Sequence, residues 1–177
     1  ERTRHHLGGL ALSAGRGHEP AFAVATELRE QRVQGVAALI GARAGFEHAL
    51  KYCHERKQGG TRLIDHQLTR HRLGDMLRRV ELCRSVARRS LAYARQSPAT
   101  HPYVTAAAKV TVTQEAMKVV DEALQLFGGV GTSREYPIEK LYRDARLALI
   151  EDGENYVLTM RLGLLAQQLY AEGWAQD

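Results

Sequence analysis

The sequence holds little cysteine, little proline and few aromatic residues, and each shortage excludes a class of protein. Its 177 residues include two cysteines and four prolines, and aromatic residues make up 6% of the chain. Cys53 and Cys83 both fall within helical patterns, so a disulfide scaffold is disfavoured and we expect a reducing compartment, the cytoplasm. No uncharged apolar run approaches the roughly 18 residues of a membrane span, and no signal pattern opens the sequence. We therefore expect no membrane partner.

Metal-ligand sets and familiar catalytic motifs are also missing. His54, His66 and His71 have no cysteine or carboxylate partner at a metal-ligand spacing, so we expect no metal site. Neither a phosphate loop of the nucleotide-triphosphatase type nor a Ser-His-Asp signature is present. What remains is an ordinary globular balance of 44% hydrophobic and 25% charged residues, typical of one domain of this length.

The charge is moderately basic, with 25 Lys and Arg against 20 Asp and Glu and a formal net charge of +5. This excess fits an anionic ligand such as a phosphate-bearing cofactor, and it also fits a plain soluble surface. Eight arginines gather in one helical stretch, where a nucleic-acid stripe is one interpretation. Asp75 and Glu81 interrupt that stretch and aromatic residues are not interleaved, so a solvated face is favoured over nucleic acid. The arginines are Arg70, Arg72, Arg78, Arg79, Arg84, Arg88, Arg89 and Arg95.

Hydrophobic periodicity predicts five helices with short joints. Pro20 suits a first helical turn, and the pairs Gly59-Gly60 and Gly128-Gly129 are typical helix stops. Such long helices can bury their apolar stripes only against one another, so we expect an all-α fold, an antiparallel four-helix-type bundle. A short irregular segment, residues 1–17, precedes it, with one short strand near residues 10–14. The predicted helices span residues 20–58, 65–94, 102–126, 137–149 and 157–169.

The first helix carries an apolar stripe that runs from Phe22 to Cys53 and includes Leu28 and Ala49. Val33, Val36, Ala37 and Ile40 recur at spacings of three and four and predict its buried face. Its interior glycines, at positions 35, 41 and 45, weaken a helix by roughly 1 kcal/mol each relative to Ala, and we expect them to allow close approach of another helix or a ligand. Because the helices are long for a bundle of this size, some apolar surface is expected to face a second copy or further domains.

Two breaks between helices are candidate sites, and each has a structural alternative. The run Gly128–Gly131 either exposes backbone N–H groups to a phosphate or simply stops a helix with a left-handed cap. Asp152, in the acidic break before Gly153, is either a general base near a buried substrate or the N-cap of the fifth helix. Periodicity favours the structural interpretation in both cases, and in neither case does it exclude the functional one.

These motifs stand in an order that resembles the C-terminal part of acyl-CoA dehydrogenases, over about 150 of the 177 residues. Gln125–Gly131 matches the family's Q-x-x-G-G-x-G, and Glu55–Gly60 resembles its E-R-x-x-F-G. The remaining matches are a glycine turn and helix entry at 15–25, H-Q at 66–67, an L-A-D-M-like element at 73–76, E-Y-P-x-E-K at 135–140 and R-D-A-R at 143–146.

The resemblance implies a fold and an activity. Family members have a helical domain, a β domain and a C-terminal four-helix bundle, so residues 1–17 would be a remnant of the β domain and its linker, and residues 18–177 the bundle. These flavoproteins use FAD to oxidise an acyl-CoA thioester between Cα and Cβ, and electron transfer flavoprotein or another acceptor takes the electrons. Self-association to a dimer or tetramer is implied too. For these 177 residues alone, the resemblance implies no stable FAD retention and no activity.

The resemblance also assigns roles to residues. Asp152 falls at the catalytic base and Gly153 directly after it, while Arg32 matches an arginine near the active site on the first long helix. Positions that contact FAD are Arg56, Gln58, His66 and Gln67, and positions where a neighbouring subunit's loop meets the ADP part are Gln125, Gly128 and Gly129. A basic side chain and exposed N–H groups suit a pyrophosphate.

Four positions depart from the family pattern. The base is Asp where most members have Glu, Gln31 occupies the alternative base position of some branched-chain members, Glu154 replaces a Thr, and Gly59 replaces a flavin-contacting Phe. The D-G-E-N sequence resembles acyl-CoA oxidases and also nitroalkane oxidases, relatives with an Asp base. Alternatives to the dehydrogenase are therefore an Asp-base relative of the oxidase type and a catalytically weak or structural subunit of a hetero-oligomer. An alkylation-response relative that binds DNA is a third.

Overall fold

In a computed structural model, residues 21–96 and 102–171 are described, with side chains at 28–95 and 103–171. All five predicted helices are confirmed, and their ends lie within three residues of the predicted ones. The irregular segment 1–17 and the strand expected near residues 10–14 lie outside the described residues. The helices are α2 (Ala21–Glu55), α3 (Gln67–Gln96), α4 (Pro102–Phe127), α5 (Ile138–Ala148) and α6 (Asn155–Ala171).

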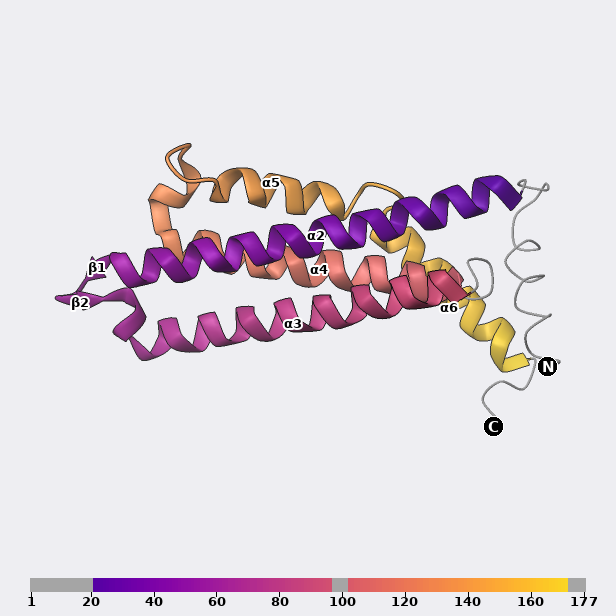
Figure 1. Cartoon of the computed structure of the whole chain (residues 1–177), viewed down its shortest axis with the longest axis horizontal. Helices are drawn as coiled ribbons and strands as arrows, with labels where there is room; N and C mark the ends of the chain where they lie inside the picture. The colour runs from indigo at the N-terminus through magenta and orange to yellow at the C-terminus, as the bar shows by residue number, and fades with distance from the viewer. Residues whose placement is uncertain (1–20, 97–101, 172–177) are drawn as a thin grey trace.

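The fold is the expected all-α antiparallel bundle. Figure 1 shows α2, α3 and α4 as long rods that lie side by side and alternate in direction, with α5 along the same bundle and α6 at the end from which α2 starts. Helix α4 is central, because it contacts α2, α3, α5 and α6. Its stripe of Val112, Ala116, Val119 and Ala123 is buried as predicted.

The predicted stripe of the first helix is buried at Leu28, Ala49 and Cys53 but not in its middle. There Val33 and Ile40 are 61% and 64% exposed, whereas Ala38 and Ala42 are buried. Small side chains let α2 lie close to α4: a Cβ at Gly45 would be 3.3 Å from Cγ2 of Val120. Close approach is thus confirmed for Gly45. At Gly35 and Gly41 no described atom lies within 4 Å of such a Cβ, so no neighbouring helix comes close there, and approach of a ligand stays a prediction.

A short hairpin joins α2 to α3, where no strand was predicted. Strand β1 (Lys57–Gln58) pairs antiparallel with β2 (Thr61–Arg62), and Gly59 and Gly60 form the turn between them. Both glycines have positive φ, 62° and 86°, which two-residue hairpin turns of the primed type require. The Gly-Gly pair therefore does more than stop a helix. It turns the chain back so that the 3₁₀ turn η1 (Leu63–Asp65) can lead into α3.

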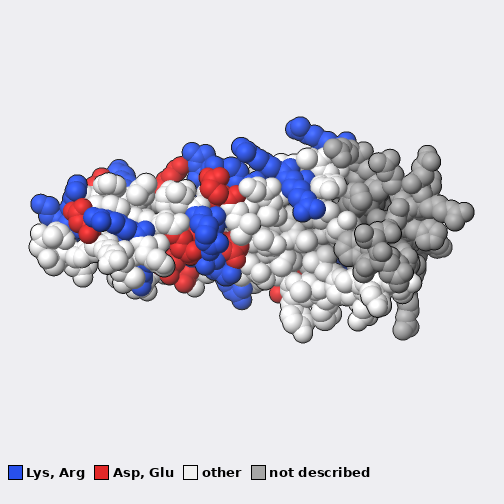
Figure 2. Space-filling model, turned by 90° about the horizontal axis from the view of Figure 1, so that it is seen from below, with Lys and Arg blue, Asp and Glu red and all other residues white. Residues whose placement is uncertain are grey.

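The arginine-rich face of α3 is largely ion-paired. Arg78 and Arg79 both contact Asp75, and Arg79 also reaches Glu115 on α4. Figure 2 shows Lys and Arg atoms beside Asp and Glu atoms along much of this face, and more nearly alone toward the grey end. These pairs support the solvated-face interpretation. None of the helices in the described ranges combines the length and apolar character needed to cross a bilayer.

Candidate functional site

The hairpin end of the bundle is shaped by hydrogen bonds around the end of α2. Arg56 N–H donates to the carbonyl of Tyr52 at 2.8 Å, and Leu63 N–H donates to the carbonyl of Arg56 at 2.8 Å, so the chain doubles back at once. Nε2 of His66 lies 3.1 Å from the carbonyl of Gln58 and 3.2 Å from Oγ1 of Thr61. His66 therefore ties the hairpin to the start of α3.

The glycine run lies across from the hairpin, at the end of α4. Gly128 has a φ of 64°, so α4 ends with the left-handed residue that the structural interpretation predicted. The chain then forms the 3₁₀ turn η2 (Gly128–Thr132). No described atom lies within 4 Å of a Cβ placed on Gly128 or Gly129, so their backbone is open. At Gly131, by contrast, a Cβ would lie 2.8 Å from Cβ of Phe127.

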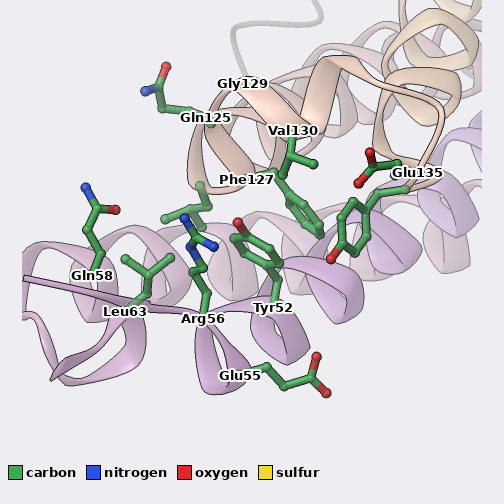
Figure 3. Close-up of a pocket in the computed structure, with 13 residues that line it drawn as sticks. Tyr52, Glu55, Arg56, Gln58, Leu63, Gln125, Phe127, Gly129, Val130 and Glu135 are labelled. Atoms are coloured by element: carbon green, nitrogen blue, oxygen red, sulfur yellow. The ribbon is translucent and has the colours of Figure 1, made fainter. Parts of the chain in front are cut away.

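A pocket of about 880 Å³ lies between these two features. It brings together five predicted cofactor residues, namely Arg56, Gln58, Gln125, Gly128 and Gly129. Figure 3 shows the side chains of Arg56, Gln58 and Gln125, which come from the end of α2, the hairpin and α4. His66 and Gln67 do not line it. A phosphate group in this pocket would meet one guanidinium, that of Arg56, and could approach the uncrowded glycine backbone closely.

Three aromatic rings form one wall of the pocket. The rings of Tyr52 and Phe127 stack with centroids 4.1 Å apart, and Tyr136 meets each edge-on, at 5.7 Å and 4.9 Å. Phe127 is 4% exposed, whereas Tyr136 is 37% exposed. The sequence analysis missed both tyrosines, although the E-Y-P element contains one of them. Together the three rings give the pocket an apolar surface. They do so in a chain where the Phe of the family's E-R-x-x-F-G element is replaced by Gly59.

The acidic break lies at the far end of α5 from this pocket. Asp152 is half-buried and has a φ of 51°, a left-handed conformation that few non-glycine residues adopt. Gly153 follows with a φ of 94°, and a Cβ there would lie 3.0 Å from Cδ2 of Leu158. The 11 residues of α5 separate this segment from the glycine run, about 16 Å at a helical rise of 1.5 Å per residue.

Glu154, not Asp152, caps α6. Its Oε2 accepts hydrogen bonds from the backbone N–H groups of Tyr156 at 2.8 Å and Val157 at 3.1 Å. The expectation that Asp152 would be the N-cap is therefore wrong. The cap falls two residues later because Asp152 and Gly153 are both left-handed, so α6 begins only at Asn155. The carboxylate of Asp152 is not engaged in capping.

A buried polar cluster attaches this segment to α4. Nζ of Lys109, a residue with no solvent exposure, donates to the carbonyl of Gly153 at 2.7 Å and to Oδ1 of Asn155 at 2.8 Å. Nδ2 of Asn155 donates to Oγ1 of Thr113 at 2.8 Å. Burial lowers the pKa of Lys109, and the charges of Asp152, Glu154 and Glu151 oppose that shift.

The sequence analysis did not identify this cluster, although one signal was available. Lys109 and Thr113 are spaced at a helical turn within the apolar stripe of α4, where a lysine has no ordinary place. A second attachment comes from α2, where Nε2 of Gln34 donates to Oε2 of Glu151. Arg32 lies two residues before Gln34 and is half-buried, and its pKa is lowered by burial and by Arg29.

Comparison with known proteins assigns the chain to a family. Residues 22–166 match the family described as acyl-CoA dehydrogenase, C-terminal domain. Cyclohexane-1-carbonyl-CoA dehydrogenase of Geobacter metallireducens is 32% identical over 123 residues, 70% of this chain and 32% of that protein. 3-Sulfinopropanoyl-CoA desulfinase of Paraburkholderia xenovorans is 32% identical over 171 residues, 95% of this chain and 43% of that protein.

A solved structure agrees with this assignment. The butyryl-CoA dehydrogenase of Megasphaera elsdenii superposes with a TM-score of 0.73 at 32% identity. The alignment covers 77% of this chain and 36% of that one. The chain therefore spans about a third of the length of the first curated relative and of this structure.

Proposed function

Because this chain belongs to the acyl-CoA dehydrogenase family, whose C-terminal domain it matches, we propose that it forms the helical part of an FAD-dependent enzyme that dehydrogenates an acyl-CoA thioester between Cα and Cβ. The domain would span residues 18–177. Electron transfer flavoprotein or another acceptor would take the electrons, and the enzyme would act in the cytoplasm.

Asp152 is the catalytic base in this proposal. The observation that carries it is the carboxylate of a half-buried, left-handed residue that does not cap α6, held beside Gly153 in a segment anchored to two helices. It would take the α proton of the thioester, and the electron pair left on Cα forms the double bond as hydride leaves Cβ. Bound FAD supplies the hydride acceptor. Gly153 and Arg32 would contact substrate at this end of the bundle.

The pocket at the hairpin end would hold the phosphate and ADP part of FAD. Arg56 would pair with the pyrophosphate, and the open backbone at Gly128 and Gly129 would approach it closely. Gln58 and Gln125 would donate hydrogen bonds from the two sides. His66 would act by fixing the carbonyl of Gln58, and Gln67 lies beside it as the first residue of α3.

The separation of these two regions supports self-association. The pocket and Asp152 lie at opposite ends of α5, so we propose that one protomer's pocket serves the FAD whose reactive ring lies near the base of its partner. Exposed apolar side chains, including Val33, Ile40 and Met160, are available for contact with a second copy or with other domains. A dimer or tetramer would bring one protomer's pocket to its partner's FAD and would also cover these apolar side chains.

The test uses the full-length, FAD-loaded protein and single-turnover flavin reduction by acyl-CoA. Asp152→Asn should abolish reduction while folding and FAD content are kept. Asp152→Glu keeps a carboxylate one methylene longer, so it should retain activity within about 10²-fold. Full reduction in Asp152→Asn would reject the base assignment.

A second candidate function is a catalytically weak or structural subunit of a hetero-oligomer, or an Asp-base relative of the oxidase type. Glu154 and Gly59 favour the structural subunit, and the Asp at the base position favours the oxidase type. A relative named as a desulfinase is evidence that family membership alone does not fix the reaction. Flavin absorbance of the purified full-length protein separates the two. A colourless protein favours the structural subunit, and reduction by a nitroalkane instead of an acyl-CoA favours the oxidase type.

A further inference from the structure

Lys109 is a fully buried cation that has no part in the proposed chemistry. A buried ammonium is tolerated only where hydrogen bonds and neighbouring charge offset its loss of water. Lys109 has both, from the carbonyl of Gly153, the side chain of Asn155 and the nearby acidic residues. Its position on the apolar stripe of α4 would otherwise suit a leucine or methionine. Its polar contacts therefore need an explanation beyond packing.

Those contacts all lead to the segment that carries Asp152. Lys109 binds the carbonyl of the residue directly after Asp152 and the side chain of the first residue of α6. Gln34 of α2 binds the side chain directly before Asp152. The three acidic positions are thus held by two helices that come from distant parts of the sequence, with Asp152 between the two attachment points.

The backbone at this point has no regular hydrogen-bond ladder to fix it. Asp152 and Gly153 have φ angles of 51° and 94°, outside the helical range on either side. The peptide planes on either side of Gly153 can rotate unless a hydrogen bond holds one of them. Nζ of Lys109 holds the next carbonyl, that of Gly153, at 2.7 Å.

We propose that Lys109 is a positioning residue that fixes the Gly153 peptide and thereby the direction of the Asp152 carboxylate. Because Lys109 is fully buried, it would act through Gly153 and not by contact with substrate or cofactor. The inference rests on the proposed role of Asp152 as the base, but the attachment itself can be measured without any reaction.

The first experiment is amide hydrogen exchange in the 177-residue chain. Lys109→Met keeps the apolar stem and removes the ammonium. We expect exchange of the Asn155 and Leu158 amides, which donate to the carbonyls of Leu149 and Glu154, to rise about tenfold or more relative to α3 and α4. Val119→Ala, a buried position on the same helix, is the matched control and should raise exchange across the bundle without favouring this segment. Equal patterns in the two variants would overturn the proposal.

If Lys109→Met does not fold, Asn155→Ala takes its place. It leaves the ammonium but removes the side-chain acceptor at 2.8 Å and the donor to Thr113. The same local rise in exchange is expected at the amides of residue 155 and Leu158. Unchanged exchange there would count against the proposal just as directly.

The second experiment asks whether the attachment serves the reaction. In the full-length, FAD-loaded protein, Lys109→Met should slow flavin reduction at saturating acyl-CoA by about 10²-fold, because a base displaced by 1 Å loses that much. The substrate dissociation constant should change by less than about threefold, since Lys109 makes no substrate contact. Val119→Ala should change neither quantity.

The two experiments separate this inference from the proposed function. If Asp152→Asn abolishes reduction while Lys109→Met reduces the flavin at the wild-type rate, Asp152 remains the base and the positioning role fails. If Asp152→Asn reduces the flavin normally, the base assignment fails, and the positioning role toward a catalytic carboxylate fails with it. A local rise in exchange would then leave only a structural attachment.

Discussion

Nε2 of Gln34, on α2, donates a 2.5 Å hydrogen bond to Oε2 of Glu151, 117 residues further along the chain. This bond joins the first described helix to the acidic segment before α6. Because the acceptor is a carboxylate and the pair is partly buried, removing this hydrogen bond should lower the free energy of unfolding more than removing an ordinary surface hydrogen bond.

Gln34→Met should therefore lower the free energy of unfolding by about 1 to 2 kcal/mol, a range typical for hydrogen bonds to charged groups. Gln114→Met, an exposed position on α4, is the matched control and should change it by less than about 0.5 kcal/mol. Urea denaturation measures both. Equal effects of the two substitutions would show that the bond to Glu151 contributes nothing.

Gly153→Ala should destabilise the chain, because its φ of 94° disfavours any side chain and the new Cβ would lie 3.0 Å from Cδ2 of Leu158. We expect a loss of about 1 to 3 kcal/mol. Gly41→Ala is the control, since that helical glycine has no described atom within 4 Å of its Cβ position. It should stabilise α2 by about 0.5 to 1 kcal/mol, so thermal unfolding should move in opposite directions for the two variants.

The glycines of the run after α4 should respond differently from one another. Gly131→Ala places a Cβ 2.8 Å from Cβ of Phe127 and 3.1 Å from the carbonyl of Leu124, so we expect a loss of about 1 to 3 kcal/mol from overpacking. Gly129→Ala meets no described atom within 4 Å and should leave stability almost unchanged. In the full-length protein it should instead weaken FAD retention, measured by flavin content after dialysis. Full retention would argue against the phosphate role of this run.

Arg79 joins α3 to α4, and its removal should be more damaging than that of a surface arginine. Its Nε lies 2.6 Å from Asp75, and it also contacts Glu115, whose side chain is 14% exposed. Arg79→Met should cost about 1 to 3 kcal/mol, because it leaves a partly buried carboxylate with fewer partners. Arg43→Met removes an exposed i,i+4 pair with Glu47 and should cost less than about 0.5 kcal/mol.

Acid should reduce the difference between wild type and Arg79→Met. Burial acts to raise the pKa of Glu115, but hydrogen bonds from Lys118 and Arg79 outweigh it and lower the pKa below the ordinary 4.5. A carboxyl with a lowered pKa stabilises the fold above its unfolded-state pKa, and that contribution is lost as pH falls through the folded value. Urea unfolding curves of both proteins at pH 7 and near pH 3 measure this. If the difference in free energy of unfolding between wild type and Arg79→Met is the same at the two pH values, Glu115 plays no part.

The two cysteines should be inert in the folded chain. Burial raises the pKa of Cys53 and of Cys83 from 9.0 to about 11. Both thiols should resist alkylation at pH 8 unless the chain is unfolded, because the neutral thiol is a poor nucleophile. Rapid labelling of native protein, followed by mass spectrometry, would contradict this.

Because of these raised thiol pKa values, the free energy of unfolding should decrease in alkaline solution. Between the unfolded pKa of 9.0 and the folded value of about 11, the unfolded chain releases these protons and the folded chain does not. Stability should therefore fall as pH rises, by up to about 1.4 kcal/mol per thiol for each pH unit. Cys53→Ala with Cys83→Ala should flatten that slope relative to wild type.

The sequence by itself determined the five helices, because their periodicity and their glycine and proline boundaries are local signals. It also placed Arg56 and Gln125 in motifs at the C-terminal ends of α2 and α4. These ends meet in one pocket because α3 runs between the two helices in the opposite direction, so α2 and α4 run parallel. The hairpin at Gly59-Gly60 was missed because two-residue strands have no period to detect.

Tertiary structure alone decided which face of α2 is buried and how the acidic segment is held. Val33 and Ile40 form as good a stripe as Ala38 and Ala42, and only close packing against α4 selects the smaller side chains. Lys109 looks out of place in its helix until Gly153 and Asn155, more than 40 residues away, come within hydrogen-bonding distance. Hydrophobic periodicity is a property of one helix at a time. Burial and hydrogen bonding depend on which other elements the fold places beside that helix.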